Sequence, residues 1–208
     1  MIRNDNHASD DLRCMFALSW RLPNFVSRFM AVAIVLFVGT LSLHSQQAKP
    51  TEYQVKAAYL YNFGKFVQWP AGFSASQNDS FIICVLGEDP FGPTLNATLR
   101  DETIAGKNVV ARRIPKPEDA LDCRILFISS SEDKQLKQIL TLLDRNSILT
   151  VSDLPQFSQR GGMVQFVLEG SKVRFEVNLA PVKHAGLTLS SELLKLALSV
   201  NRNPHRGD

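Results

Sequence analysis

Two short runs of apolar residues constrain the fold of this chain more than any other feature. Residues 81–86 read FIICVL and are followed by Gly87, and residues 124–129 read RILFIS. A strand with one solvated face alternates apolar and polar residues, whereas a strand buried on both faces is apolar along its length. The two runs therefore predict a largely parallel sheet with helices packed against it.

Segments with helical periodicity separate the apolar runs. Residues 53–69 place apolar side chains on one broad stripe, and Pro70 ends the pattern. The other elements expected before residue 152 are a helix between Pro90 and Ala105, strands at 107–112 and 147–152, and a helix capped by one of Ser129, Ser130 and Ser131. This alternation of strands and helices predicts an α/β sheet with right-handed crossovers.

The pattern changes after residue 160. Strand-like runs at 163–168 and 172–179 are separated by only three residues, which predicts a β-hairpin. Ser190 can then cap a closing helix. The apolar face of that helix would comprise Leu193, Leu194, Leu196, Ala197 and Val200. We therefore expect an α/β fold with a mixed, mostly parallel sheet flanked by helices, ending in a C-terminal hairpin and a closing helix.

The first 48 residues have the features of a targeting segment. Basic residues precede an uncharged stretch of 15 residues from Phe29 to Leu43. That length is typical of a signal peptide and falls short of the roughly 18 to 20 residues of a membrane-spanning helix. We expect cleavage near residues 45–48 and export, with an uncleaved anchor, a core helix and a later start at Met15 or Met30 as alternatives. Residues 49–202 would then form a single domain, followed by a polar tail at 203–208.

Export would leave two of the three cysteines in the mature chain. Cys14 departs with the leader, whereas Cys84 and Cys123 remain. An even pair of cysteines in an oxidising compartment forms a disulfide by default. We therefore predict a bridge between Cys84 and Cys123.

Charge and motifs argue against nucleic-acid binding and against catalysis. The chain has 23 Lys and Arg against 20 Asp and Glu, a net charge of +3, and no run of five basic residues. After residue 48 it contains only His184 and His205, and its sequence has no G-x-S-x-G, H-E-x-x-H or Walker motif and no Cys/His zinc cluster. We expect no enzyme activity, no cofactor and no metal.

Polar residues follow several of the expected strands. Open α/β sheets bind ligands at the carboxyl ends of their strands, so these residues are candidates for binding a small molecule. They are also the residue types that turns and helix caps require, and that alternative stays open. The ligand candidates are Glu88, Asp89, Ser129, Ser130 and Asp153.

Two further groups of residues are candidates for contacting a partner protein. Residues 53–69 hold six aromatic side chains, more than one helical stripe can bury, and exposed Tyr and Trp residues often anchor interfaces. The second expected hairpin strand alternates apolar residues with a polar stripe. Core filling and a solvated sheet face are the alternatives. The partner candidates are Tyr59, Tyr61, Trp69, Lys172, Arg174, Glu176 and Asn178.

Two stretches together resemble the YfiR family of exported bacterial proteins, and with the segments between them the resemblance covers residues 51–200. They read KAAYLYNFGKFVQWP and GGMVQFVLEGSKVRFEVNLAPVKHAGLTLSSELLKLA, and FIICVLGEDPFG and CRILFIS between them also fit. The resemblance implies a periplasmic, dimeric α/β protein. It further implies that the protein holds an inner-membrane diguanylate cyclase of the YfiN type inactive through the cyclase's periplasmic sensor, and so lowers cyclic di-GMP. A periplasmic small-ligand carrier or sensor without a cyclase partner is the alternative, and an exported hydrolase is disfavoured by the residue inventory.

The chain departs from the family in one respect that matters. The characterised branch of the family that this chain resembles carries a second cysteine pair near the GGM segment. This chain has none there, and Ser158, Gln165 and their neighbours carry no thiol. Redox control through a second pair is therefore not expected here.

Overall fold

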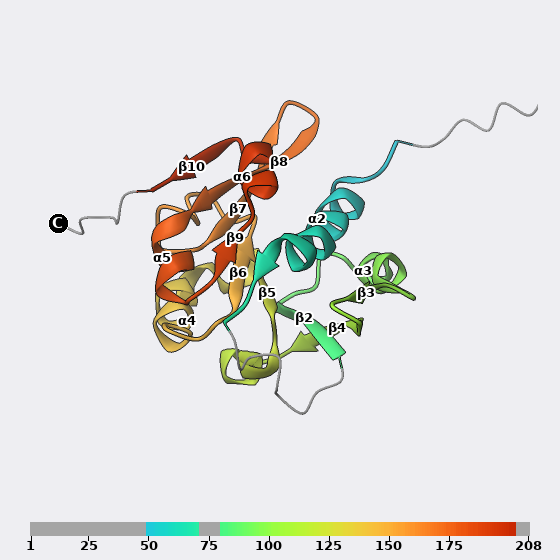
Figure 1. Cartoon of the computed structure of the whole chain (residues 1–208), viewed down its shortest axis with the longest axis horizontal. Coiled ribbons are helices and arrows are strands. Elements are labelled where there is room, and N and C mark those ends of the chain that lie inside the picture. Colours follow the sequence, from blue (N-terminus) through green and yellow to red (C-terminus); the bar gives the residue numbers. More distant parts are fainter. Residues whose placement is uncertain (1–48, 71–79, 203–208) are drawn as a thin grey trace, which may run out of the picture. The chain divides into compact units, whose positions relative to one another are not determined.

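The computed structural model describes residues 49–70 and 80–202 (Figure 1). The predicted leader at 1–48, its cleavage site and the predicted tail at 203–208 lie outside the described residues. Within the described part of the chain, no helix is both long enough and apolar enough to cross a membrane.

The sheet is mixed and mostly parallel, as predicted. In the described residues its order is β10-β8-β7-β6-β5-β2-β4-β3. Neighbouring strands from β4 across to β7 run parallel, whereas β3–β4 and β7–β8 are antiparallel and β10 is parallel to β8. The strands are β2 (Ser80–Leu86), β3 (Thr103–Ile104), β4 (Lys107–Ile114), β5 (Ile125–Ile128), β6 (Leu149–Ser152), β7 (Val164–Glu169), β8 (Lys172–Asn178) and β10 (Ser199–Asn201).

Helices connect and cover these strands. The α-helices of the described chain are α2 (Glu52–Phe66), α3 (Pro93–Leu99), α4 (Leu136–Leu142), α5 (Leu179–His184) and α6 (Ser191–Leu196). Two 3₁₀ helices, η2 (Pro117–Asp122) and η3 (Ser130–Gln135), flank β5 in sequence, and β1 (Val67–Gln68) pairs with β9 (Thr188–Leu189) in a separate ribbon.

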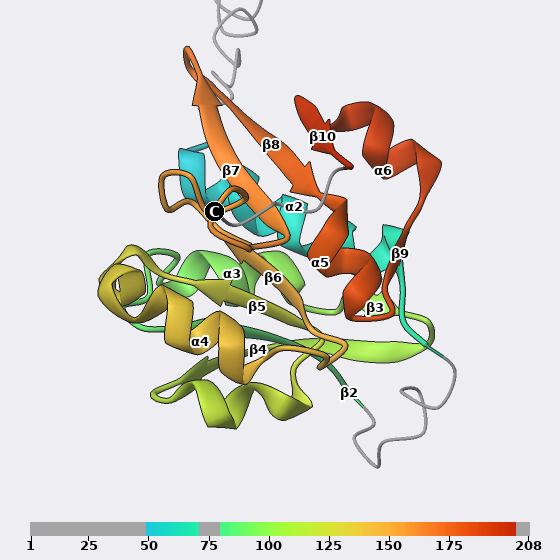
Figure 2. The ribbon, with the colours of Figure 1, turned by 90° about the vertical axis from the view of Figure 1, so that its left-hand side faces the viewer.

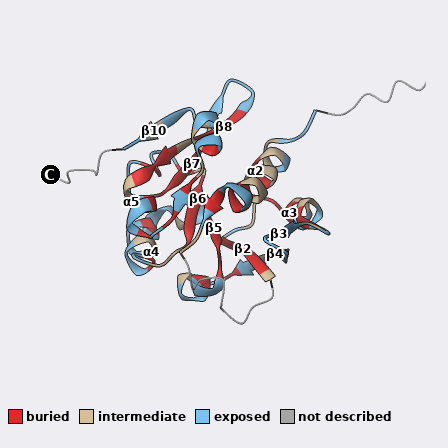
Figure 3. Ribbon diagram, in the orientation of Figure 1, coloured by how far each residue is buried: buried red, intermediate tan, exposed pale blue. Residues whose placement is uncertain are grey.

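Successive residues of β2 pack into two separate hydrophobic cores, which explains why the run is apolar throughout. Ile83 and Val85 join a core with α2 and α3, whereas Ile82 and Leu86 join a core with η2 and α4. Figure 3 shows the central strands buried between layers whose outer surfaces are exposed. Both faces of the sheet are therefore covered, as the apolar runs predicted.

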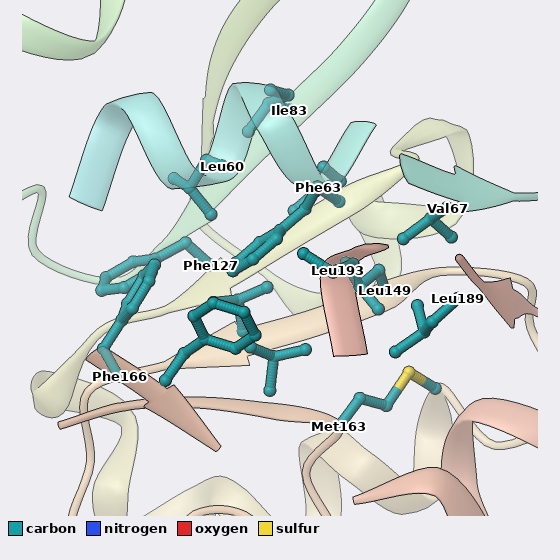
Figure 4. Packing of buried hydrophobic residues seen from close by; sticks show 14 of the residues in the cluster. Leu60, Phe63, Val67, Ile83, Phe127, Leu149, Met163, Phe166, Leu189 and Leu193 are labelled. Carbon is teal, nitrogen blue, oxygen red and sulfur yellow. The ribbon is translucent and has the colours of Figure 1, made fainter. Parts of the chain in front are cut away.

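Helix α2 begins with a capping box and packs its apolar face on the sheet. The Thr51 side chain accepts a hydrogen bond from the backbone of Gln54, whose side chain in turn accepts one from the Thr51 backbone. Figure 4 shows Leu60 and Phe63 extending from α2 among core residues that include Phe127. Phe63 is fully buried, so α2 is fixed firmly against the strands.

The predicted disulfide joins Cys84 in β2 to Cys123, which directly precedes Arg124 and β5. The two Cα atoms lie 5.9 Å apart, within the range of native bridges. Both cysteines are completely buried in the core that includes α4. Because β2 and β5 are neighbouring parallel strands, the bridge is a covalent link between adjacent strands at the centre of the sheet.

The predicted hairpin is formed by β7 and β8, with Glu169 opposite Lys172 at its end. Gly170 in the turn has φ of +60°, a conformation that glycine adopts without strain. Strand β6 pairs only with Val164 and Gln165 of β7, and β10 only with residues 176–178 of β8. The outer part of the hairpin therefore extends past its neighbours in the described sheet, as Figure 2 shows.

Three local expectations were wrong. The helix after β5 begins with the 3₁₀ turn η3, and the Ser129 side chain makes no capping hydrogen bond. The second hairpin strand stops at Asn178, because Leu179 begins the short helix α5. The closing helix α6 ends at Leu196, and Val200 lies in β10 instead. The chain leaves the helix because the edge of β8 offers backbone groups for pairing. The first of these contacts is the hydrogen bond from the Leu198 N–H to the Phe175 carbonyl, at 2.7 Å.

Candidate functional site

A surface groove lies between α2 and the outer part of the β7–β8 hairpin, and we call it the α2–hairpin groove. Its volume is about 490 Å³. Its apolar lining includes Val55, Tyr59, Leu168 and Val173, and the charged residues that line it are Lys49, Glu52, Lys172 and Arg174. The fold thus brings together three of the partner candidates, Tyr59, Lys172 and Arg174, from two segments more than 100 residues apart in sequence.

The hairpin register creates the apolar side of this groove. Leu168 lies opposite Val173, and Phe166 lies opposite Phe175, so these four side chains share one face of the hairpin. The Tyr59 ring of α2 packs against both phenylalanines, with ring centres 5.9 Å from Phe166 and 5.4 Å from Phe175. The inner end of the groove is therefore firmly packed, whereas Leu168 at its outer end is 57% exposed.

A charge cluster around the buried Lys56 fixes the first turns of α2 beside this groove. Lys56 is only 3% exposed, and its Nζ lies 2.6 Å from the Asp153 carboxylate at the end of β6 and also pairs with Glu52. The Tyr53 hydroxyl donates to the same Asp153 oxygen at 3.2 Å, and the Tyr53 ring centre lies 4.5 Å from Lys56 Nζ. These contacts link α2 to the carboxyl end of the sheet.

Burial and ion pairing have opposite effects on the pKa of Lys56. Burial by itself lowers the pKa of Lys56, but hydrogen bonds to Asp153 and Glu52 outweigh it, so the pKa lies above its ordinary value. Burial, together with the negative charge of Asp153, raises the pKa of Tyr53. At neutral pH the cluster therefore holds a charged lysine and a neutral tyrosine.

The other ligand candidates lie at the carboxyl ends of β2 and β5, where the order of the parallel strands reverses. Asp89 accepts hydrogen bonds from the Phe91 backbone and from Arg113 Nε, each at 2.8 Å, and the Glu88 N–H donates to Ser131 Oγ at 3.0 Å. Ser129 is buried, whereas Ser130 is exposed. The structure thus brings the two strand ends together but engages Asp89, and likewise Asp153, in contacts within the protein. Binding of a ligand there stays a prediction.

The polar stripe of β8 is less uniform than its alternation suggested. Lys172 is exposed and Arg174 and Glu176 are half-buried, but Asn178 is 3% exposed. The Asn178 side chain caps α5 by accepting from the Ala180 N–H, and it donates to the Ser158 carbonyl at 2.8 Å. Its polar atoms are satisfied inside the protein, so the structure does not place Asn178 on an open partner face.

Ser158 and Gln165, which lie near the GGM segment where this chain has no second cysteine pair, contact each other. The backbone N–H and the hydroxyl of Ser158 both donate to the Gln165 side-chain oxygen, at 3.0 and 3.2 Å. Both residues are buried. A hydrogen-bonded pair therefore joins the loop before β7 to β7 itself.

Tyr61 and Trp69 lie outside the α2–hairpin groove. Trp69 packs edge-on against Phe81 with ring centres 5.3 Å apart, and its indole N–H is buried without an acceptor among the described residues. It lines a second hollow of about 490 Å³, which we call the Trp69 hollow. A hydrogen bond to Glu102 raises the pKa of Tyr61, which also lies beneath the ammonium of Lys65.

Sequence reasoning missed Val55 and Leu168 as members of the groove. Both look like ordinary core positions in their helix and strand patterns. The sequence signal for Leu168 was its place beside the hairpin turn; in the structure it pairs with Val173 of β8, whereas β6 pairs no further along β7 than Gln165.

The fold resembles that of one solved structure in particular. A solved structure described as a conserved domain protein from Vibrio cholerae O1 biovar eltor aligns with a TM-score of 0.51 and 9% sequence identity, over 73% of this chain and 60% of that one. The chain thus spans about three fifths of that protein's length. The ABC domain in complex with L-Trp from Streptococcus pneumonia aligns with a TM-score of 0.41 and 11% identity, over 62% of this chain and 57% of that one.

A family model described as YfiR/HmsC-like matches residues 53–198. The match begins in the first turn of α2 and ends beside β10, and so includes both sides of the α2–hairpin groove and the disulfide. Because the match extends over more than half of the sequence, this chain belongs to the YfiR/HmsC-like family.

Proposed function

We propose that this protein is a periplasmic regulator that binds the periplasmic sensor of an inner-membrane diguanylate cyclase of the YfiN type, represses the cyclase, and so lowers cyclic di-GMP. The observation that carries the proposal is the family match over residues 53–198, because this family suggests periplasmic regulation of cyclic di-GMP signalling. In this proposal the protein acts by contact rather than by catalysis, and it does so as a homodimer.

The surface of the domain supports an action through contact. Protein interfaces combine aromatic or aliphatic anchors with a polar rim. The α2–hairpin groove has this composition, with Tyr59 and Leu168 beside Lys49, Lys172 and Arg174. Its walls are also held in place by the core, so a partner would meet a preformed surface.

The proposal is tested by deleting the gene and measuring cyclic di-GMP in the cells. We expect the level to rise, and to return to normal when the intact chain is supplied. A version lacking residues 1–48 should be retained in the cytoplasm and should fail to restore the level. Unchanged cyclic di-GMP after deletion, with the membrane cyclase present, would contradict the proposal.

A second candidate function is the sensing of a small molecule, and the Trp69 hollow is the observation that favours it. The hollow has the size of a small-ligand site, and the Trp69 indole N–H beside it has no acceptor in the described structure. A ligand with different affinities for the free and partner-bound protein would make the regulator a sensor. Native mass spectrometry of protein purified from the periplasm should then show a retained small molecule, and loss of that mass in Trp69→Ala would locate it.

A further inference from the structure

We propose that the α2–hairpin groove binds an acidic segment of a partner protein. One large apolar side chain of that segment inserts between Tyr59 and Leu168, and carboxylates beside it meet the cationic lining residues. This inference rests on the proposed function, because it names the chemistry by which the regulator recognises its partner.

The size and lining of the groove fit an apolar anchor. A volume of about 490 Å³ accommodates one or two large side chains, and Val55, Tyr59, Leu168 and Val173 provide an apolar lining. Leu168 is 57% exposed, although it lies on the same hairpin face as the buried Phe166 and Phe175. An exposed leucine that continues a buried apolar face is a surface that a partner can cover.

The mostly positive charges that line the groove favour a partner segment with acidic side chains. Lys49, Lys172 and Arg174 all line it, and Glu52 is the one acidic residue that lines it in the described structure. Glu52 already pairs with Lys56, so its charge is largely balanced within the protein. The net field at the groove is therefore positive, and carboxylates on the incoming segment give complementary charge.

The walls of the groove do not need to reorganise. Tyr59 is wedged against Phe166 and Phe175, and the Lys56–Asp153 pair holds the first turns of α2 to the end of β6. Beyond Gln165, β7 pairs on one side only, with β8, in the described sheet. Backbone groups on this edge of the hairpin remain available for hydrogen bonds to an extended partner segment.

The experiment compares two groove variants with one matched control. The groove variants are Leu168→Ser, which removes the exposed apolar contact, and the double change Lys172→Glu with Arg174→Glu, which reverses the charge. The control also reverses two positive charges, but outside the groove: the exposed Lys134 and Lys137 are both replaced by Glu. Melting temperatures establish that each variant is folded, and Leu168→Ser keeps the test valid if the charge reversal fails to fold.

Each protein is titrated with two probes. One is the purified periplasmic segment of the membrane cyclase, and the other is a pair of synthetic peptides in which a single Trp is flanked either by Glu or by Lys. We expect the cyclase segment and the Glu-flanked peptide to bind at least tenfold more weakly to both groove variants, with the control unchanged. Binding of the Glu-flanked peptide should weaken as salt is added and should shift the backbone NMR signals of Leu168 and Ser171, whereas the Lys-flanked peptide should not bind.

The outcomes separate this inference from the proposed function. Equal binding of the cyclase segment to wild type and to both folded groove variants would overturn the groove as the docking site and leave the proposed function standing. If the cyclase segment fails to bind wild type while the Glu-flanked peptide occupies the groove, the proposed function fails and the groove proposal holds. If neither probe uses the groove, the inference is wrong. A separate titration uses vesicles of anionic phosphatidylglycerol, and the inference is also wrong if both groove variants weaken vesicle binding while peptide binding stays unchanged.

Discussion

Lys56 illustrates at the scale of one residue how a charge is accommodated inside this protein. A buried ammonium group is costly unless it is paired, and Lys56 has two carboxylate partners and an aromatic ring beside it. One partner, Glu52, is a turn away on the same helix, whereas Asp153 lies 97 residues away in sequence. The pair is therefore a tertiary contact between α2 and the sheet.

Removing Asp153 should destabilise the fold. We expect Asp153→Ala to lower the free energy of unfolding by about 2 to 3 kcal/mol, somewhat less than a fully broken buried pair costs, because Glu52 still pairs with Lys56. Adding Lys56→Met should recover part of the loss, since no buried charge is then left behind. Urea unfolding of both single variants and the double variant measures the coupling.

The matched control is Asp133→Ala. Asp133 forms an exposed ion pair with Arg160, which should contribute less than about 1 kcal/mol. A loss in Asp153→Ala no larger than that of the control would show that the Lys56 pair does not hold α2 in place.

Trp69 and Tyr61 should respond differently to truncation, although both are half-buried. Trp69 packs on Phe81 in the core, so Trp69→Ala should cost about 3 kcal/mol of stability. Tyr61 also packs against this core in part, but its other contacts are polar ones to Glu102 and Lys65, so Tyr61→Ala should cost less, about 1 kcal/mol. Thermal unfolding of the two variants checks this order, and the reverse order would mean that Tyr61 contributes more to core packing than Trp69.

At the scale of elements, β2 is the strand on which the fold depends most. It pairs with β4 on one side and β5 on the other, packs into both hydrophobic cores, and carries one end of the disulfide. A cross-link at this position restricts the unfolded chain over a loop that spans 39 positions. Its stabilising effect should therefore be large.

Reduction of the Cys84–Cys123 bridge should lower the free energy of unfolding by about 4 kcal/mol, as chain entropy suggests for a loop of this length. Unfolding in urea with and without a reducing agent measures the difference. The variant Cys84→Ala with Cys123→Ala serves as the control, because it should lose stability yet show no response to the reducing agent. Two titratable thiols in denatured, non-reduced protein would refute the bridge.

At the scale of the whole molecule, the domain at residues 49–202 is proposed to act after export. The apolar stretch from Phe29 to Leu43 precedes Lys49, and the Lys49 ammonium donates to the Ser171 hydroxyl in the hairpin turn at 3.2 Å. Cleavage near residues 45–48 would therefore place the new N-terminus within a few residues of the α2–hairpin groove.

Mass spectrometry of the periplasmic fraction should show a chain that lacks roughly the first 45 to 48 residues. Replacing Val35 and Leu36 by Arg should block export, because charges interrupt the apolar stretch that the export machinery recognises, and full-length protein should then accumulate in the cytoplasm. Recovery of full-length protein from the membrane of wild-type cells would show that the leader is an anchor.

The layers of the fold could be predicted from local patterns. Continuous apolar runs indicated strands covered on both faces, period-two alternation indicated the hairpin, and the even pair of cysteines indicated the bridge between Cys84 and Cys123. The end of the last helix could not be predicted in this way. Leu198 leaves the helical pattern because the edge of β8 provides a backbone acceptor at Phe175, and that edge exists only in the folded sheet.

The sequence by itself thus determined the mostly parallel sheet covered on both faces, its hairpin and its disulfide. Burial on two faces and alternation appear in local residue patterns, and the cysteine pair follows from the number of cysteines. Tertiary structure alone decided that Tyr59 of α2 meets the hairpin, that Lys56 pairs with Asp153, and that Asn178 turns inward. The physical reason is that each of these depends on which helix packs over which strand. Residue periodicity indicates which face of a helix or strand is buried. It carries no information about which other element covers that face.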